Sequence, residues 1–393
     1  MIQTIKKLSK PMFFLSTIIL YIILGFIVIT SVPYAFYTEI YDIQKPLPFH
    51  GNTWLNPYKS CSFDNDNAGW KKSNFHGHSK EWGGLTDGKT DKDVFFKKYK
   101  SMGYHSIGLS NYQFISHDFA KDNGFVPCYE HGYNVWKRHH VCIGAQHVVW
   151  LDFIWGQSLH HKQTMINILK PTVQVLALAH PKFRNSFEPE DFIYLSNYDC
   201  IEVLNHYRTS DIHWDSALSN GHKAWIVADD DTHNVLDSGE TGVCWTMIYA
   251  PNNGNQQEIT TALKNGQAFG VQGKQGKMDI FPTLIHLTDS IYSITMMDTV
   301  ESITMIGQNG KKLAITLNSN HLDYILKKTD TYIRAIIKTP QTTIWLNPIL
   351  RDSQTPIPQK NDLQTILYRL LWLIVYTIII VLVWKKKSRK KHS

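Results

Sequence analysis

Two long apolar stretches, one near each end of the chain, stand out in the pattern of hydrophobic and polar positions. Residues 12–32 (MFFLSTIILYIILGFIVITSV) carry no charge, and residues 366–384 carry a single one, Arg369, near their start. An α-helix needs about 20 predominantly apolar residues to cross a bilayer, and a long arginine side chain can reach the membrane interface. The pattern therefore predicts transmembrane helices over 12–32 and 366–384.

Each stretch has an alternative interpretation. The first could be a cleaved signal peptide, but it exceeds the usual apolar core of about 7–15 residues, and Pro33 and Tyr34 follow it instead of a small-residue cleavage site. The second could be a buried core helix, but it ends at Trp384 in a block of lysines, as a stop-transfer helix does. For both stretches, the flanking residues favour a membrane anchor over the alternative.

Basic residues set the predicted orientation of these helices. Lysines at positions 6, 7 and 10 precede the first stretch, and residues 385–393 (KKKSRKKHS) follow the second. Because cytoplasmic flanks carry an excess of lysine and arginine, we expect residues 1–11 and the basic tail to be cytoplasmic. The sequence thus predicts a two-pass protein of the cell membrane, with the bilayer as a partner and an extracytoplasmic region between the helices.

Short apolar runs alternate with amphipathic segments over residues 73–281. The apolar runs include HSIGLS, VQVLALAHP, CIEVLN and KAWIVADDD, whereas residues 94–102 and 213–221 have helical periodicity. Strands separated by helices are typical of βα units around a parallel sheet or barrel. The sequence predicts an α/β domain here, preceded by a linker over 33–72.

Residues 282–352 change to the period-two alternation of β-strands. A helix is expected just before them, over 257–266, and Asn309-Gly310 predicts the turn of a β-hairpin. Several such strands in a row predict a small β-sandwich. We therefore expect a domain boundary near Pro282 and a second linker over 353–365.

Composition and charge narrow the class of protein. With 43% hydrophobic and 19% charged residues, the chain of 393 residues is expected to fold. The net charge of +7 falls to +1 without the six lysines and arginines of the tail, so nucleic acid is not an expected partner. The five cysteines are odd in number and contain no CxxC pair, which predicts neither a zinc ribbon nor a complete disulfide framework.

His76 and His78, in NFHGHS, are the first candidates for chemistry. Because they are two residues apart, their imidazoles point to the same side of an extended segment and can bind one metal ion. With 19 histidines in the chain, such a pair is also expected by chance. Alone, the pair is a weak signal.

Further histidines and carboxylates follow or end other apolar runs. They are Glu130 in FVPCYE, His140 at the start of HVCIGA, His180 after VLALA, Glu202 in CIEVLN, and Asp231 and His233 after WIVAD. Each has an ordinary structural explanation, such as a surface charge for Glu130, a packed ring for His140 or a helix cap for Asp231. In barrels, however, strand ends converge at one face. Taken together, these residues predict a metal site.

These motifs, in this order and spacing, resemble those of the PHP (polymerase and histidinol phosphatase) superfamily, and within it the branch that includes carbamate-ester hydrolases. The resemblance covers residues 75–349. It is carried by NFHGHS, Thr86-Asp87-Gly88, VPCYEH, His140-Val141 with Gly144, ALAHP, CIEVLN, HWDSAL, ADDDTHN, YIRAII and Leu346-Asn347-Pro348-Ile349.

The resemblance implies a distorted (β/α)7 barrel with a cluster of divalent metals, such as zinc, manganese or iron, at one mouth, followed by the β-sandwich. Position by position, one metal would be held by His76, His78, Glu130 and Asp231. A second would be held by Glu130, His140 and His180, with Glu130 as the bridging carboxylate. His233 would complete the cluster or contact the substrate.

One segment departs from the family pattern. Where the family has Thr-Asp-His, this chain has Ser110-Asn111-Tyr112, and neither asparagine nor neutral tyrosine is a good substitute for a carboxylate or an imidazole ligand. His117 lies five residues further on and could compensate for the missing imidazole. The departure predicts two metals rather than three.

Two metals suit hydrolysis of a phosphoester, because they activate a water and bind both the attacking and the leaving oxygen. Asp231 could accept the proton of the water, and His180 or His233 could protonate the leaving group. Arg208 could bind a substrate phosphate or be an ordinary surface arginine. The sequence thus predicts a membrane-anchored, metal-dependent phosphoesterase that acts on a small-molecule or surface-polymer ester.

Two other functions stay open. The resemblance of the C-terminal strands suggests hydrolysis of carboxylic or carbamate esters. The Ser110-Asn111-Tyr112 departure suggests a degenerate, non-catalytic domain that holds metal and binds a glycan or a partner protein.

Overall fold

The computed structural model describes residues 2–63, 69–85, 88–353 and 357–391. The chain forms two compact units. One consists of Met1–Asp42, Leu151–Thr164 and Gln359–Ser393, and the other of Ile43–Trp150 and Met165–Pro358. Thr86 and Asp87, which belong to one of the PHP-like motifs, lie outside the described residues.

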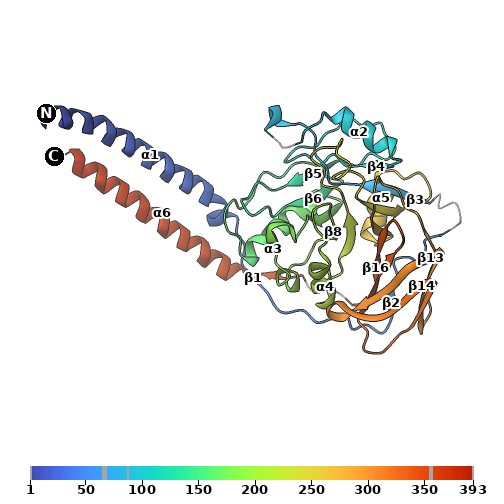
Figure 1. Cartoon of the computed structure of the whole chain (residues 1–393). Helices are drawn as coiled ribbons and strands as arrows, with labels where there is room; N and C mark the ends of the chain where they lie inside the picture. Colours follow the sequence, from blue (N-terminus) through green and yellow to red (C-terminus); the bar gives the residue numbers. More distant parts are fainter. Residues whose placement is uncertain (1, 64–68, 86–87, 354–356, 392–393) are drawn as a thin grey trace. The chain divides into compact units, whose positions relative to one another are not determined.

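The first unit contains the two apolar stretches as long helices. They are α1 (Ile2–Phe36) and α6 (Asp362–Lys391), which run side by side in Figure 1, and the strands β1 (Tyr41–Asp42) and β17 (Gln359–Lys360) pair at their base. The hydroxyl of Ser31 lies 2.8 Å from that of Tyr376. By length and composition, Ile18–Phe36 and Asp362–Lys385 could each cross a membrane.

A loop from the middle of the sequence also belongs to this unit and lies along α1. The indole of Trp155 donates a hydrogen bond to the Thr30 hydroxyl at 3.0 Å, and its ring meets the ring of Phe26 edge to face at 6.1 Å. Both partners lie inside the apolar segment Ile18–Phe36. Tryptophan is a residue typical of the membrane interface, and the sequence did not predict this contact.

The second unit is built on two sheets. One has five strands in chain order: β5 (Cys128–His131), β6 (His140–Ile143), β7 (Val175–Leu178), β8 (Cys200–Leu204) and β9 (Trp225–Ala228). Every residue of these strands is buried, as expected for continuous apolar runs that are covered on both faces. The strands β7, β8 and β9 are parallel, whereas β5, β6 and β7 are antiparallel.

The other sheet has ten strands and carries the C-terminal half of the unit. Its main path runs in the order β12-β13-β15-β16-β11-β10-β3-β4, with β14 on β13 and β2 on β16. The strands are β2 (Trp54–Leu55), β3 (Trp70–Asn74), β4 (Ser106–Ile107), β10 (Cys244–Tyr249), β11 (Ala268–Gln272), β12 (Pro282–Leu287), β13 (Ile291–Gly307), β14 (Lys311–Ile325), β15 (Tyr332–Lys338) and β16 (Thr343–Arg351).

Two isolated bridges connect the sheets. Gly77 pairs with Thr232 just beyond β3 and β9, and Tyr112 pairs with Glu130 on β5. The five-stranded sheet thus curls as part of a barrel, with its first and last strands linked to segments that follow β4 and β3. The predicted mixed α/β class is confirmed, and the segments that follow these strands meet at one place.

Most predicted elements are present with small shifts at their ends. The expected helices appear as α2 (Lys92–Ser101), α4 (Asp211–Ser219) and α5 (Gln256–Lys264), and the hairpin turn at Asn309-Gly310 joins β13 to β14. One further α-helix, α3 (Leu159–Leu169), precedes β7, and short 3-10 turns cover Trp82–Gly84, Lys170–Thr172, Phe183–Asn185, Asp191–Ile193 and Gln308–Gly310.

Two features differ from regular βα units. The segment between β5 and β6 is too short for a crossover helix, so these strands form an antiparallel hairpin. The boundary expected near Pro282 falls at the start of β12, and strands before and after it pair in one continuous sheet, because β11 pairs with β16. All five cysteines are free.

A buried ion pair joins α4 to the ten-stranded sheet. The guanidinium of Arg334 on β15, only 1% exposed, donates to both carboxylate oxygens of Asp215, at 2.8 and 2.7 Å, and lies 3.1 Å from Asp211. Removing one partner of a buried pair costs up to about 3–5 kcal/mol. Here the carboxylate of Asp215 would lose its cation in a site that leaves it only 13% exposed.

We therefore expect Arg334→Met to lower the free energy of unfolding by up to about 3–5 kcal/mol. Denaturant unfolding of the purified chain measures this change. Lys338→Met, at an exposed position of the same strand, is the matched control and should change stability little. Equal effects of the two substitutions would show that the ion pair does not stabilise the fold.

Candidate metal centre

His76 and His78 lie in the extended segment that follows β3. This segment runs beside the segment after β9, since the His78 amide donates to the Thr232 carbonyl and the Asp231 amide to the His76 carbonyl, both at 2.9 Å. In an extended chain, alternate side chains point to the same face. Both imidazoles are therefore directed into the same interior, and both residues are fully buried.

Two carboxylates, those of Glu130 and Asp231, converge on these two histidines. Nε2 of His76 lies 3.2 Å from Oδ1 of Asp231 and 3.3 Å from Oε1 of Glu130. Nε2 of His78 lies 3.2 Å from the same Asp231 oxygen and 3.3 Å from Oε2 of Glu130. The structure thus brings together the four residues predicted for the first metal.

Two of these atoms give a test of whether the residues fit a metal ion. Nε2 of His76 and Oε2 of Glu130 are buried and make no hydrogen bond to any described residue. Buried polar atoms are nearly always satisfied, and those left unpaired call for an explanation such as a bound ion. Imidazole nitrogen and carboxylate oxygen are together the usual ligands of zinc, manganese and iron, so the donor set fits a divalent metal.

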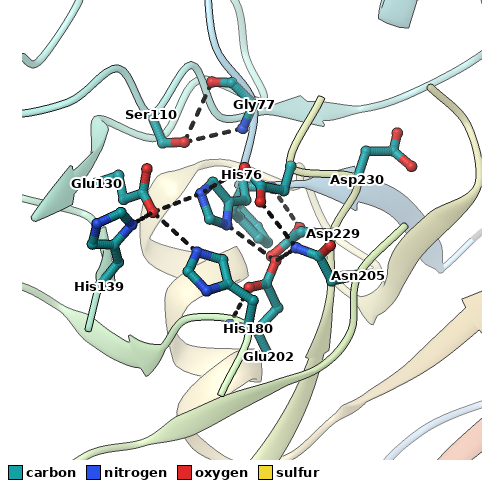
Figure 2. A network of polar contacts seen from close by, with 12 residues as sticks. His76, Gly77, Ser110, Glu130, His139, His180, Glu202, Asn205, Asp229 and Asp230 are labelled. Carbon is teal, nitrogen blue, oxygen red and sulfur yellow. Dashed lines mark hydrogen bonds and ion pairs between the residues drawn. The ribbon is translucent and has the colours of Figure 1, made fainter. Parts of the chain in front are cut away.

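Glu130 also belongs to a second group of ligands, with His139 and His180. Its Oε1 lies 3.2 Å from Nε2 of His180 and forms a close contact with Nδ1 of His139 (Figure 2). The carboxylate thus lies between two groups of imidazoles. That is the position a carboxylate bridging two metals would need.

His139 takes the place that the sequence predicted for His140. The register of β5 and β6 pairs Glu130 with Val141 and His131 with His140. Directly paired residues point to the same face and neighbours to opposite faces, so His139, two residues before Val141, joins Glu130. The structure directs His140 to the other face, where its ring lies 5.6 Å from the ring of His131. The structure therefore places His139, and not the predicted His140, beside Glu130.

Glu202 on β8 contacts two of the candidate ligands, His76 and His180. Its Oε1 lies 3.1 Å from Nδ1 of His76, and its Oε2 accepts the backbone N–H of His180 at 2.6 Å. A carboxylate on one imidazole nitrogen fixes the ring and directs the other nitrogen to a metal. The Asn205 amide connects this carboxylate to the ligands, because it donates to Glu202 at 3.2 Å and to Asp231 at 3.3 Å (Figure 2). The sequence placed Glu202 at a strand end but assigned it no role.

The two central carboxyls are held in their charged form. Burial alone would raise the pKa of Glu130, but His139 and His76 beside it bring that pKa well below its usual range. Burial is likewise outweighed at Asp231, where His76 and His78 lower the pKa of the carboxyl. Both groups therefore act as acceptors only, the state in which a carboxylate can coordinate a cation.

Backbone strain is concentrated at two of these residues. His180 has φ +28° and Asp231 has φ +51°. Both values lie in the left-handed region, which residues other than glycine rarely adopt. Such residues cost about 1–3 kcal/mol each and cluster at functional sites, where the surrounding structure holds them. At this centre, the strained backbone positions the imidazole of His180 and the carboxylate of Asp231.

The segment that departs from the family pattern is committed to other contacts. Oδ1 of Asn111 accepts the Ser79 amide at 2.8 Å, and its Nδ2 donates to the Ser79 hydroxyl at 2.9 Å. The Tyr112 ring stacks on His78, with centroids 4.7 Å apart. His117 is exposed and packs near Phe125. Among the described residues, none of these three adds a ligand to the groups around Glu130.

His233 and Arg208 lie outside the groups of ligands. The His233 ring packs 4.5 Å from the ring of His78, with 15% of its side chain exposed, so it lies at the rim of the centre. Arg208 is exposed in the loop after β8, and its guanidinium donates to the carbonyl of Tyr207. The structure thus brings His233 to the metal centre. The backbone of Arg208 pairs with that of Asn205, at 3.1 and 3.2 Å, but its guanidinium is directed to the Tyr207 carbonyl and not to a ligand.

Comparisons with known proteins give one structural similarity. No model of a known protein family matches the chain, and no curated protein matches it. Among solved structures, a two-domain protein of Bacteroides vulgatus ATCC 8482, described as containing a predicted PHP-like metal-dependent phosphoesterase, is similar at 12% sequence identity. The similarity covers 79% of this chain and 92% of that one, with a TM-score of 0.41. A similarity at this level does not establish a function, whereas the geometry of the centre does indicate one.

Proposed function

We propose that the chain is a metal-dependent hydrolase of the PHP superfamily, and specifically a phosphoesterase with two divalent metals. The observation that carries this proposal is the position of Glu130, whose carboxylate lies within 3.3 Å of imidazole nitrogens from both groups of ligands. One metal would be held by His76, His78, Glu130 and Asp231. The other would be held by Glu130, His139 and His180.

When bound, two such metals lower the pKa of a water and stabilise both oxygens of a displacement. The residues of the chain supply the rest. The carboxylate of Asp231 accepts a hydrogen bond from Asn205 at 3.3 Å, which orients it among the ligands. It would hold the proton of the attacking water only transiently, because the imidazoles that lower its pKa make it a weak base. His233 is the better proton donor to the leaving group, because it lies at the partly exposed rim. The Nε2 of His180 points instead to Glu130.

We propose further that α1 and α6 anchor the chain in the cell membrane, with both ends in the cytoplasm and the hydrolase outside it. The apolar segments Ile18–Phe36 and Asp362–Lys385 and the basic residues that flank them support this arrangement. The contact of Trp155 with Thr30 gives α1 an aromatic neighbour suited to the interface. Protease treatment of intact cells, followed through tags at both ends, tests the orientation.

Elemental analysis combined with a substrate panel tests the function. Purified full-length protein, loaded with Mn²⁺ or Zn²⁺, is expected to hold two metals per chain and to hydrolyse phosphomonoesters or phosphodiesters. His78→Ala should abolish that activity. Aryl carboxylic and carbamate esters, assayed side by side, distinguish the alternative ester hydrolase. A folded protein that holds metal but cleaves none of these substrates would establish the non-catalytic alternative.

A further inference from the structure

A pocket with a volume of about 680 Å³ opens beside the metal centre. Its walls include Trp82, Leu85, Tyr112, Tyr133, Lys137 and Trp150. Sites for small organic ligands usually measure about 300–1,000 Å³ and are lined mainly by apolar and aromatic groups with a few polar ones. The pocket therefore has the size and composition of a ligand site, and no role has been assigned to it so far.

Tyr112 connects this pocket to the metal ligands. Its ring stacks on the ring of His78, at 4.7 Å and 24°, and meets the ring of His139 at 5.4 Å and 73°. Its backbone forms the bridge with Glu130. Because the same tyrosine lines the pocket, a molecule whose ester group lies at the metal centre can place its organic part in the pocket.

The aromatic walls are held in place by hydrogen bonds to the backbone. The Trp82 indole donates to the carbonyl of Tyr112 at 2.9 Å, and the Tyr133 hydroxyl donates to the carbonyl of Trp150 at 2.7 Å. The rings of Trp82 and Trp150 also pack against each other at 5.8 Å. Even so, 44% of Trp82, 47% of Tyr133 and 59% of Trp150 are exposed. The rings thus present preorganised apolar surface, and the polar atoms of Trp82 and Tyr133 are already hydrogen-bonded.

This chemistry favours a flat aromatic occupant over a sugar. The described lining offers a sugar only the polar side chains of Gln113, Asn134 and Lys137 beside the aromatic rings. A sugar would therefore lose more hydroxyl–water hydrogen bonds than it regains, which is unfavourable. An aromatic ring keeps its apolar faces in contact with Trp and Tyr rings, and such stacking contributes about 1–3 kcal/mol for a nucleobase. Among the described residues that line the pocket, the one charged side chain is Lys137, whose ammonium lies 5.4 Å from the Tyr112 ring centre. Because Tyr112 also contacts the metal ligands, the Lys137 ammonium could attract an anionic ester group between the pocket and the metal centre.

We infer that this pocket binds the aromatic alcohol portion of the substrate, so that the substrates are aryl or heteroaryl phosphomonoesters. This inference rests on the proposed phosphoesterase function. In the reaction, the oxygen of water forms a bond to phosphorus and the bond between phosphorus and the aryl oxygen breaks. One proton of the water then passes to that oxygen, which leaves as the phenol, and inorganic phosphate remains.

The test compares two substrates and two tryptophan variants in the full-length, metal-loaded chain held in lipid nanodiscs. 2-Naphthyl phosphate should have a KM about tenfold lower than that of glycerol phosphate, in line with the stacking contribution. Trp150→Ala should raise the KM for 2-naphthyl phosphate about tenfold and leave that for glycerol phosphate unchanged. Trp136→Ala is the matched control, because this tryptophan is 49% exposed but does not line the pocket. It should change neither value.

Equal KM values for the two substrates, or a lower one for decyl phosphate than for 2-naphthyl phosphate, would overturn the inference. Calorimetric titration with 2-naphthol separates this failure from failure of the proposed function, because the phenol needs no hydrolysis. Binding of 2-naphthol that Trp150→Ala weakens, in a protein that cleaves no phosphoester, would support the aromatic pocket and reject the phosphoesterase. Hydrolysis without any such binding would do the reverse.

Discussion

Glu130→Gln is expected to remove most of the bound metal and to lower kcat at least about 10³-fold, which corresponds to a loss of about 4 kcal/mol of transition-state stabilisation. Glu130 is fully buried, and its two oxygens lie close to imidazole nitrogens of both groups of ligands. Glutamine keeps the shape of the side chain but replaces one anionic oxygen with an NH₂ donor and removes the negative charge. It therefore cannot bridge two cations. Elemental analysis and steady-state kinetics on the same preparation measure both effects.

The control for this substitution is Glu301→Gln, at an exposed position of β13. It makes the same chemical change away from the centre and should leave metal content and kcat unchanged. Thermal unfolding of both variants shows whether the chain still folds. A folded Glu130→Gln variant that retains two metals and full activity would contradict the assignment of Glu130 as the bridging ligand.

Local features of the fold could be predicted because local interactions determine them. Helix α5 is an example: Asn255 caps it by accepting the Glu258 amide, and apolar residues with helical spacing face the core. The turn between β13 and β14 is another, since Asn309 has φ +59° and Gly310 has φ +69°, the conformation that an Asn-Gly turn adopts. In both cases the neighbouring residues carry enough information to locate the element.

The convergence of four candidate ligands could be predicted for a different reason. His76, His78, Glu130 and Asp231 each follow or end an apolar run, and the ends of strands around a curled sheet converge. The order of the apolar runs along the chain is enough to predict this convergence. The prediction does not need the pairing of particular residues.

Features that depend on register or on loops could not be predicted in this way. In the adjacent pair His139-His140, the sequence does not show which ring faces Glu130, because that depends on how β5 pairs with β6. Shifting the register by one residue exchanges the two faces. The aromatic pocket is a second case, since Trp82, Tyr112 and Trp150 come from separate loops with no shared periodicity.

The pair His139 and His140 also provides the strictest test of the centre. We expect His139→Gln to lower the metal content from two per chain to about one and kcat by about 10²–10³-fold, because the second group loses an imidazole close to Glu130. His140→Gln makes the same change at the next residue, on the opposite face of β6. It should retain both metals and most of the activity.

Metal analysis, kinetics and thermal unfolding of the two variants measure these effects together. Both rings are buried, so His140→Gln can lower the unfolding temperature without affecting the metal content of the folded protein. The combination that would refute the register of β5 and β6 is the reverse one, with metal lost in His140→Gln and kept in His139→Gln. Equal losses in both variants would instead show that this strand supports the centre as a whole, and would leave the position of His139 beside Glu130 without functional meaning.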